Sequence, residues 1–512
     1  MVSVATLASR LLGLVREQVF AALLGASNLA DAYIAAFRLP NLLRDLLAEG
    51  ALSQAFVPTF RAELTRHGPA DAYRVAARVT GNAMVVIGGL VALAMVAAPA
   101  LYGTLVGDFA VVPGKVALTV TLARIMLPFI LIASLTAIAM GMAQAQDSFV
   151  APALSPATFN LVAIAVGVGL ESAGLPGYQV VLGWAIGTVV AGLAQLTLQL
   201  PGLWRLGWRP RVGLDLRLRD PAVRRVVRVM GPAIIAAAAV QVNVFVNTAY
   251  ASEDPGAVSW LAYAFRFLQL PIGVFGVAIA TVSTTRFADA AARADRTALA
   301  RHATDGLRLV AFLCIPAMVG LVVDAEAAIR LIYQHGRFAP RDTDATATAL
   351  TLYVLGLPAY AAVKVMAPLC YATDRTRLAV VAALVAIAGN LAANAALHLR
   401  YGYRGLALST ALAAVVNAAL LYGAISRWVV RLPHRELAGH LVRVVIAAAV
   451  MGAAALATGR LLDGAVGHDH LGPRALDALG PAVVGAAVYA AAAWALGIAE
   501  IRPLTDRLRR RR

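Results

Sequence analysis

The stretch RLPNLLRDLLAEGALSQAFVPTF, residues 38–60, holds four charged side chains in what otherwise reads as one membrane helix. These are Arg38, Arg44, Asp45 and Glu49. A charge at the centre of a membrane helix costs about 2.5 to 3.5 kcal/mol, so such residues face water, an anion or one another. The stretch therefore predicts a helix whose polar side lines a cavity inside an all-helical membrane bundle.

The composition of the whole chain agrees with a membrane protein. Of the 512 residues, 61% are hydrophobic and 14% charged, against roughly 25% charged in soluble domains. Apolar windows of about 20 residues, enough to cross a core roughly 30 Å thick, recur from end to end. We expect an integral membrane protein that begins near Met1 with a retained helix. The net charge of +17 belongs to its loops, and no nucleic-acid partner is expected.

Polar and Gly/Pro clusters divide the apolar runs into about fourteen expected membrane helices. Their expected ranges are 3–24, 29–60, 79–103, 116–143, 150–171, 178–201, 226–251, 257–284, 305–323, 346–371, 379–398, 405–425, 440–460 and 476–498.

The connections between these helices differ strongly in positive charge. When they are assigned alternately to two sides, about 29 Lys and Arg residues fall on one side and about 8 on the other. Cytoplasmic loops carry the excess of Lys and Arg, so both termini are predicted to be cytoplasmic.

The longest cytoplasmic connection, residues 202–225, suggests the division of the chain. We predict an N-lobe of six helices over 1–201, this linker, a C-lobe of six helices over 226–428, and two further helices with a basic tail over 429–512. The linker is interpreted as a solvated segment in contact with lipid headgroups, in preference to a regulatory site.

Seven cations are left at membrane depth once the loops are accounted for, and they carry the functional information. Arginine stays charged and pairs bidentately with phosphate oxygens, so a cluster of arginines suits a phosphorylated anion. The alternative is that they pair with acids and join helices. Because the cations outnumber nearby acids, an anion-binding cavity is favoured. The seven are Arg10, Arg16, Arg38, Arg44, Arg124, Arg266 and Lys364.

The second expected helix carries a polar stripe. Asp31, Arg38 and Asp45 are spaced seven apart, which places them nearly on one face, with Glu49 one turn further. Arg38 is the cation most readily interpreted as structural, because an acid flanks it on each side. Arg44 lies beside the stripe.

Other motifs are weaker. The asparagines 243, 247, 390 and 394 could coordinate a cation, but hydrogen bonding between helices is favoured. Cys314 and Cys370 lie inside apolar runs and read as packing residues. No nucleotide-binding loop, metal-ligand cluster or nucleophile constellation is evident. We therefore expect a transporter that has no cofactor and no bound metal, and not an enzyme.

The opening stretch also carries a family resemblance. TLASRLLGLVREQVFAALLGASNLADAYIAAFRLPNLLRDLLAEGALSQAFVPTF resembles the first two helices of the MurJ/MviN family, the lipid II flippases of bacterial peptidoglycan synthesis. MGPAIIAAAAVQVNVFVNT, VSWLAYAFRFLQLPIGVFGVAIAT and LYVLGLPAYAAVKVMAPLCYA resemble its seventh, eighth and tenth helices. The resemblance covers essentially the whole chain.

The resemblance implies a fold of the multidrug/oligosaccharidyl-lipid/polysaccharide exporter type, with two six-helix lobes around a cavity and two extra helices for a lipid tail. It implies a multi-pass protein of the inner membrane that flips lipid II, with cell-wall synthesis and division proteins as possible further partners. The expected substrate-binding residues are Arg10, Arg16, Arg44 and Arg266. The expected supporting or gating residues are Asp31, Arg38, Asn41 and Glu49.

Departures from the family pattern leave alternatives open. The acids that often flank the eighth-helix arginine are replaced by Phe265 and Gln269, which puts carboxylate gating there in doubt. An exporter of another polyprenyl-linked glycan, or of a drug, is the first alternative. A membrane enzyme and a non-transporting scaffold for cell-wall enzymes are the others.

Overall fold

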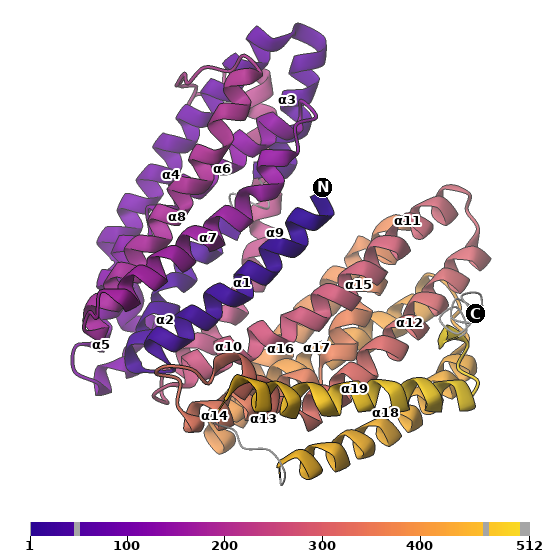
Figure 1. Ribbon diagram of the computed structural model, residues 1–512. Coiled ribbons are helices and arrows are strands. Elements are labelled where there is room, and N and C mark those ends of the chain that lie inside the picture. The colour runs from indigo at the N-terminus through magenta and orange to yellow at the C-terminus, as the bar shows by residue number, and fades with distance from the viewer. Residues whose placement is uncertain (1, 46–51, 464–469, 502–512) are drawn as a thin grey trace. The chain divides into compact units, whose positions relative to one another are not determined.

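The computed structural model describes residues 2–45, 52–463 and 470–501, and these residues form helices and connecting turns without β-strands (Figure 1). They group into two compact units. Unit 1 consists of Met1–Ser259 with His335–Ala339, and unit 2 of Trp260–Gln334 with Pro340–Arg512.

Unit 1 is a bundle of long apolar helices. Its helices α4, α6, α7 and α8 run alongside one another (Figure 1), with α1 packed mainly on α7 and α2 mainly on α5. The elements are α1 Val2–Leu24, α2 Asn28–Leu43, α3 Ser53–His67, α4 Pro69–Leu105, η2 Gly107–Val111, α5 Lys115–Met126, α6 Phe129–Gln144, α7 Val150–Ser172, α8 Gly177–Arg205 and α9 Pro221–Ala251.

The core of unit 1 is held by aromatic rings from several helices. Phe129 of α6 lies 5.7 Å from Phe159 of α7, and Phe56 lies 5.5 Å from Phe60 within α3, measured between ring centroids. These rings are at least nine-tenths buried. The first pair holds α6 against α7, the helix on which α1 packs.

Unit 2 contains the remaining helices and begins within α10, at Trp260. Helices α18 and α19 pack side by side, in yellow in Figure 1, and α18 also packs along α12. The elements are α10 Ala257–Pro271, η3 Ile272–Gly276, α11 Val277–Ala292, α12 Arg296–Val323, α13 Ala325–Tyr333, α14 Pro340–Val354, α15 Leu357–Ala372, α16 Thr376–Tyr401, α17 Tyr403–Trp428, α18 His434–Asp463, α19 Leu471–Ala495 and η4 Ala499–Ile501.

Each of the fourteen expected ranges contains helix, but the range 29–60 holds two helices, α2 and α3, and its residues 46–51 lie outside the described ones. Fourteen membrane crossings are not confirmed. Among the described residues, ten helices are long and apolar enough to span a membrane. An eleventh is added if α14 and α15, bent by 43° at Leu355 and Gly356, form one span. Helix α1 is not among them and carries three charges, and α2 and α3 have only 16 and 15 residues.

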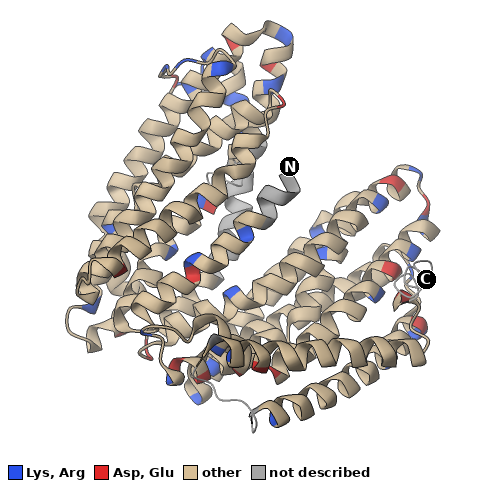
Figure 2. Ribbon diagram, in the orientation of Figure 1, with Lys and Arg blue, Asp and Glu red and all other residues tan. Residues whose placement is uncertain are grey.

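Charged residues are concentrated toward helix ends and connections, and long uncharged stretches lie between them (Figure 2). This is the distribution that a chain adapted to hydrocarbon requires. The four-part division at 201, 225 and 428 stays a prediction, because the two compact units describe packing and α9 packs within unit 1.

Two glycines allow a close contact inside unit 1. Gly25, with φ +61°, ends α1, and a Cβ on it would lie 2.4 Å from the carbonyl oxygen of Arg337. Gly336, with φ +57°, would place a Cβ equally close to the carbonyl oxygen of Ala22. The backbone N–H of Arg337 donates to that Ala22 oxygen at 2.8 Å. Only glycine fits both the left-handed conformation and the space.

Candidate substrate-binding site

Helix α1 presents the first two expected arginines in different environments. Arg10 is exposed, whereas the side chain of Arg16 is 19% exposed. Arg16 forms an ion pair with Glu17, and its guanidinium carbon lies 5.5 Å from the ring centroid of Phe159 on α7. A guanidinium over an aromatic face is held in place without losing its charge. The side chain of Arg16 is therefore held in a fixed position, whereas the side chain of Arg10 is accessible to a ligand.

The end of α2 gathers a second polar group. Arg44 donates from Nη2 to Oδ1 of Asp45 at 2.8 Å and from Nε at 3.2 Å. Asn41 donates to the other carboxylate oxygen of Asp45 at 3.3 Å. The side chains of Arg44 and Asp45 are 26% and 35% exposed. Asp45 thus orients Arg44 and Asn41 and leaves the guanidinium partly accessible.

The expected polar stripe along this helix is not continuous. Asp31 is completely buried, Arg38 is half-buried, and Asp45 is partly exposed. The α-helix is regular from Asp31 to Leu43, so Asp31 and Arg38 keep the expected register and differ in burial. A wider π-type turn at Arg44 and Asp45 changes the phase at Asp45. Glu49, the fourth expected supporting residue, lies outside the described residues.

Asp31 is the centre of a buried network. Its carboxylate accepts hydrogen bonds from Lys115 Nζ at 2.9 Å, from the backbone N–H of Gly256 at 2.8 Å, and from the N–H and hydroxyl of Ser259 at 3.0 and 2.6 Å. The Gly256 and Ser259 amides lie at the start of α10, where backbone N–H groups have no helical partner. A carboxylate on α2 therefore caps α10 and joins it to α5.

Lys115 is a functional neighbour that the sequence reasoning missed. It lies just outside the expected helix 116–143, but it begins α5 with a side chain only 2% exposed. Its ammonium lies 3.9 Å from the ring centroid of Phe109. A signal was present, because Lys115 and Lys364 are the only lysines in an arginine-rich chain.

Arg266, the fourth expected arginine, belongs to unit 2. It is exposed on α10, as is Gln269 one turn later, while Tyr263 and Leu268 of the same helix are buried. The neighbouring Phe265 contacts the Tyr353 ring with centroids 5.5 Å apart. The structure describes Arg266 within unit 2 and the other three arginines within unit 1.

Positive charge exceeds negative charge on the described part of α1 and α2 with their neighbour Lys115. The cations are Arg10, Arg16, Arg38, Arg44 and Lys115, and the acids are Glu17, Asp31 and Asp45. Lys115 forms an ion pair with Asp31 in the protein interior. The remaining four arginines face two acids, so the surface that these helices present is cationic and suits an anion.

The remaining candidate residues have local roles. Arg124 donates to the Met95 carbonyl at 2.9 Å, and Lys364 is exposed on α15. Asn394 donates to Asn390 at 3.2 Å and accepts from Ser409 of α17. The second bond joins α16 to α17 and favours the interpretation of Asn394 as a helix-joining residue.

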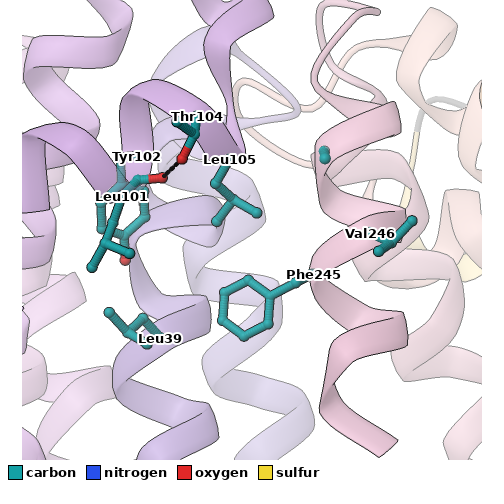
Figure 3. A pocket seen from close by; sticks show the side chains of 8 residues that line it. Leu39, Leu101, Tyr102, Thr104, Leu105, Phe245 and Val246 are labelled. Atoms are coloured by element: carbon teal, nitrogen blue, oxygen red, sulfur yellow. Dashed lines mark hydrogen bonds between the residues drawn. The ribbon is translucent and has the colours of Figure 1, made fainter. Parts of the chain in front are cut away.

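An apolar cavity of about 420 Å³ lies in unit 1, between α2, α4 and α9 (Figure 3). Phe245 of α9 and Leu105 of α4 project into it from opposite sides, with Leu39 below them (Figure 3). The lining is almost entirely hydrocarbon, so it offers no partner for an anion. It is lined by Leu39, Leu101, Tyr102, Thr104, Leu105, Phe245, Val246 and Ala249.

Comparison with known protein sequences gives a consistent result. The profile of the family described as "Lipid II flippase MurJ" matches residues 20–469. A "Probable lipid II flippase MurJ" of Rhizobium meliloti is 34% identical over 511 residues, covering 99% of this chain and 95% of the relative. A "Lipid II flippase MurJ" of Burkholderia cenocepacia is 34% identical and covers 96% and 95%.

Solved structures agree with the sequence comparison. A "Lipid II flippase MurJ, inward closed conformation" superposes with a TM-score of 0.79 at 25% identity, covering 98% of this chain and 99% of that one. An inward-facing multidrug transporter of the MATE family has a TM-score of 0.67 at 14% identity, covering 84% and 95%. The second likeness concerns the fold alone.

Proposed function

This chain belongs to the MurJ family of lipid II flippases, and from that premise we propose that it carries lipid II from the inner to the outer leaflet of the cytoplasmic membrane. Its many apolar helices make it a multi-pass membrane protein. One observation carries the proposal to particular residues, namely the excess of arginine over acid on α1 and α2. A transporter of neutral molecules would have no use for these charges, which are costly in a membrane.

The arginines are proposed to bind the diphosphate of lipid II. Arg16 and Arg44 are each oriented by the acid that follows them in the chain, Glu17 and Asp45. Guanidinium groups held in this way can form paired hydrogen bonds to phosphate oxygens. Arg10 is exposed on the same helix as Arg16, and Arg266, exposed on α10, is proposed as the fourth phosphate-binding arginine.

The prenyl tail is proposed to remain in the lipid along α18 and α19. Both helices expose large apolar side chains, as a surface in contact with hydrocarbon requires. On α18 these include Leu441, Val442, Val445, Ile446, Val450, Leu456 and Leu461, and on α19 Leu476, Leu479, Val483, Val484 and Trp494.

Transport is proposed to follow alternating access, in which two lobes rock around a site near the midplane. Binding of the anionic headgroup would neutralise the arginines and favour closure of the cavity. The empty, positively charged carrier would then return under the membrane potential, at about 2.3 kcal/mol per charge per 100 mV.

Rescue of a bacterium depleted of its own lipid II flippase tests this function. The parent chain is expected to restore lipid II on the outer face, and Arg44→Ala to fail at matched membrane levels. Arg66→Ala, which removes an exposed arginine from α3, is the control and is expected to rescue. Insertion of the parent without rescue would point to another lipid-linked glycan. Equal rescue by Arg44→Ala would assign Arg44 a structural role.

A further inference from the structure

The connection between α8 and α9, residues 206–220 and called the strap here, is fixed along the first half of α4. Gly213 N donates to the Ala77 carbonyl at 3.0 Å. Asp215 and Asn82 exchange two hydrogen bonds, of 2.9 and 3.0 Å, between the strap backbone and the asparagine amide. Arg78 forms an ion pair with Asp220. These bonds hold the strap against α4, so it is not a loose linker.

Side chains alternate between the two faces of the strap. Gly213 faces α4, where a Cβ on it would meet Arg78, and Asp215 is buried. Val212, Leu214 and Leu216 lie between and beyond them and are 63%, 62% and 52% exposed. This alternation is what an extended backbone produces. One methyl group of Val212 lies close to Gly81 of α4, but more than half of each of the three residues, called the outward row, is left uncovered.

Exposed arginines surround the outward row. Arg209 and Arg224 donate to carbonyl oxygens of the connection, whereas Arg211, Arg217 and Arg219 are exposed close to the row. The connection at residues 292–301 has exposed arginines too, but no large exposed apolar side chain. The combination of cations with an uncovered apolar edge thus distinguishes the strap from that connection.

The position of the strap on α4 places it at a membrane boundary. From Val79 to Leu105 α4 carries no charge, a length of about 40 Å at 1.5 Å per residue. That length covers a hydrocarbon core of roughly 30 Å. The strap contacts α4 from Ala77 to Asn82, where this uncharged stretch begins. This end lies on the side that the distribution of arginine predicts to be cytoplasmic.

We propose that the strap is a binding surface for anionic phospholipids, in which Val212, Leu214 and Leu216 enter the headgroup boundary and Arg211, Arg217 and Arg219 bind lipid phosphates. An apolar edge alone would enter a bilayer of any charge, and the arginines add an attraction to anionic lipids. Together they select an anionic surface, at roughly fivefold per arginine. The strap would bind these lipids whatever headgroup the protein transports.

A fluorescent label on the outward row tests the proposal in proteoliposomes of the full chain. Cys314 and Cys370 are buried and are replaced by alanine, after which Leu214→Cys carries an environment-sensitive dye. The dye is expected to shift to the blue and to be quenched by lipids brominated near the headgroup when phosphatidylglycerol is present. Both effects should be weaker in phosphatidylcholine alone.

Three triple variants separate charge from folding. Arg211→Gln/Arg217→Gln/Arg219→Gln is expected to abolish the preference for phosphatidylglycerol, and replacement of the same residues by lysine to retain it. Arg293→Gln/Arg296→Gln/Arg301→Gln removes equal charge from the other connection and should change nothing. The proposal is overturned if the dye stays in water with both lipids, if it is quenched equally in both, or if inorganic phosphate reproduces the shift in phosphatidylcholine vesicles.

Discussion

Asp31 shows how one buried side chain can organise three helices. It is fully buried, and its partner Lys115 is nearly so. Removal of one member of a buried ion pair leaves the other charge without compensation, which typically destabilises a protein by about 3 to 5 kcal/mol. Asp31→Asn is therefore expected to lower the thermal unfolding temperature of the detergent-purified protein markedly.

The double variant Asp31→Asn/Lys115→Met is the control for that prediction. It removes both charges and keeps side chains of similar size, so it is expected to be more stable than Asp31→Asn alone. If both variants were equally unstable, the stabilising contribution of Asp31 would come from its bonds to Gly256 and Ser259 and not from its pairing with Lys115.

Asp215 makes the strap sensitive to acid. Hydrogen bonds from the backbone N–H groups of Asp220 and Arg219, at 2.8 and 2.9 Å, lower the pKa of its carboxyl group. A pKa lowered by folding contributes stability above the ordinary carboxyl value of about 4, and this contribution is lost as the pH falls through the lowered pKa. The protection of residues 206–220 from hydrogen exchange, measured relative to the intrinsic exchange rate at each pH, is expected to fall in that range.

Asp215→Asn provides the comparison. An amide side chain does not titrate, so exchange in the strap should be faster at neutral pH and change less on acidification. An identical pH dependence in the parent and in Asp215→Asn would assign the titration to another group.

At the scale of elements, the packing of the strap on α4 depends on a glycine. A Cβ on Gly81 would lie 1.8 Å from the carbonyl oxygen of Gly213, a distance that the backbone cannot accept. Gly81→Ala is expected to displace the strap and to speed its cleavage by trypsin, which cuts after its arginines. Gly88→Ala on the same helix is the matched control, because a Cβ there meets nothing within 4 Å. Cleavage of the two variants at equal rates would contradict the packing of the strap on α4.

The sequence predicted the helices well because long apolar runs ended by polar or Gly/Pro clusters leave few other possibilities in a membrane. It did not predict the bend of 43° between α14 and α15, although Gly356 and Pro358 are there, since such residues are also tolerated in straight membrane helices. Along α2, Asp31 and Arg38 keep the seven-residue register, whereas the backbone widens at Arg44 and changes the phase at Asp45, which no local pattern indicated.

The candidate site was predictable in its residue types and less so in its geometry. Arg16, Arg44 and Asn41 were found because charged and amide groups are rare within apolar runs. Lys115 was missed because a lysine beside Gly114 reads as a loop residue, and its partner Asp31 lies 84 positions away in the chain. Contacts of that kind follow from tertiary packing, which local patterns do not encode.

For the whole molecule, the excess of arginine predicts that transport depends on voltage. Lipid II flipping in proteoliposomes is expected to accelerate when a potassium diffusion potential makes the cytoplasmic side negative, because that field returns the empty cationic carrier. Arg16→Gln/Arg44→Gln should reduce the dependence, and Arg66→Gln should preserve it. If the rate of lipid II flipping by the parent chain did not change with the membrane potential, this coupling would be ruled out.

The lysines also give the molecule a chemical property of practical value. One of the two, Lys115, is enclosed by Asp31 and Phe109, and the other, Lys364, is exposed. Amine-reactive reagents should therefore modify the native chain at a single ε-amino group besides its α-amino group. The same reaction reports on local unfolding, because acylation of Lys115 requires the region around α5 to open. Mass spectrometry of its tryptic peptide over time would measure how often it does so.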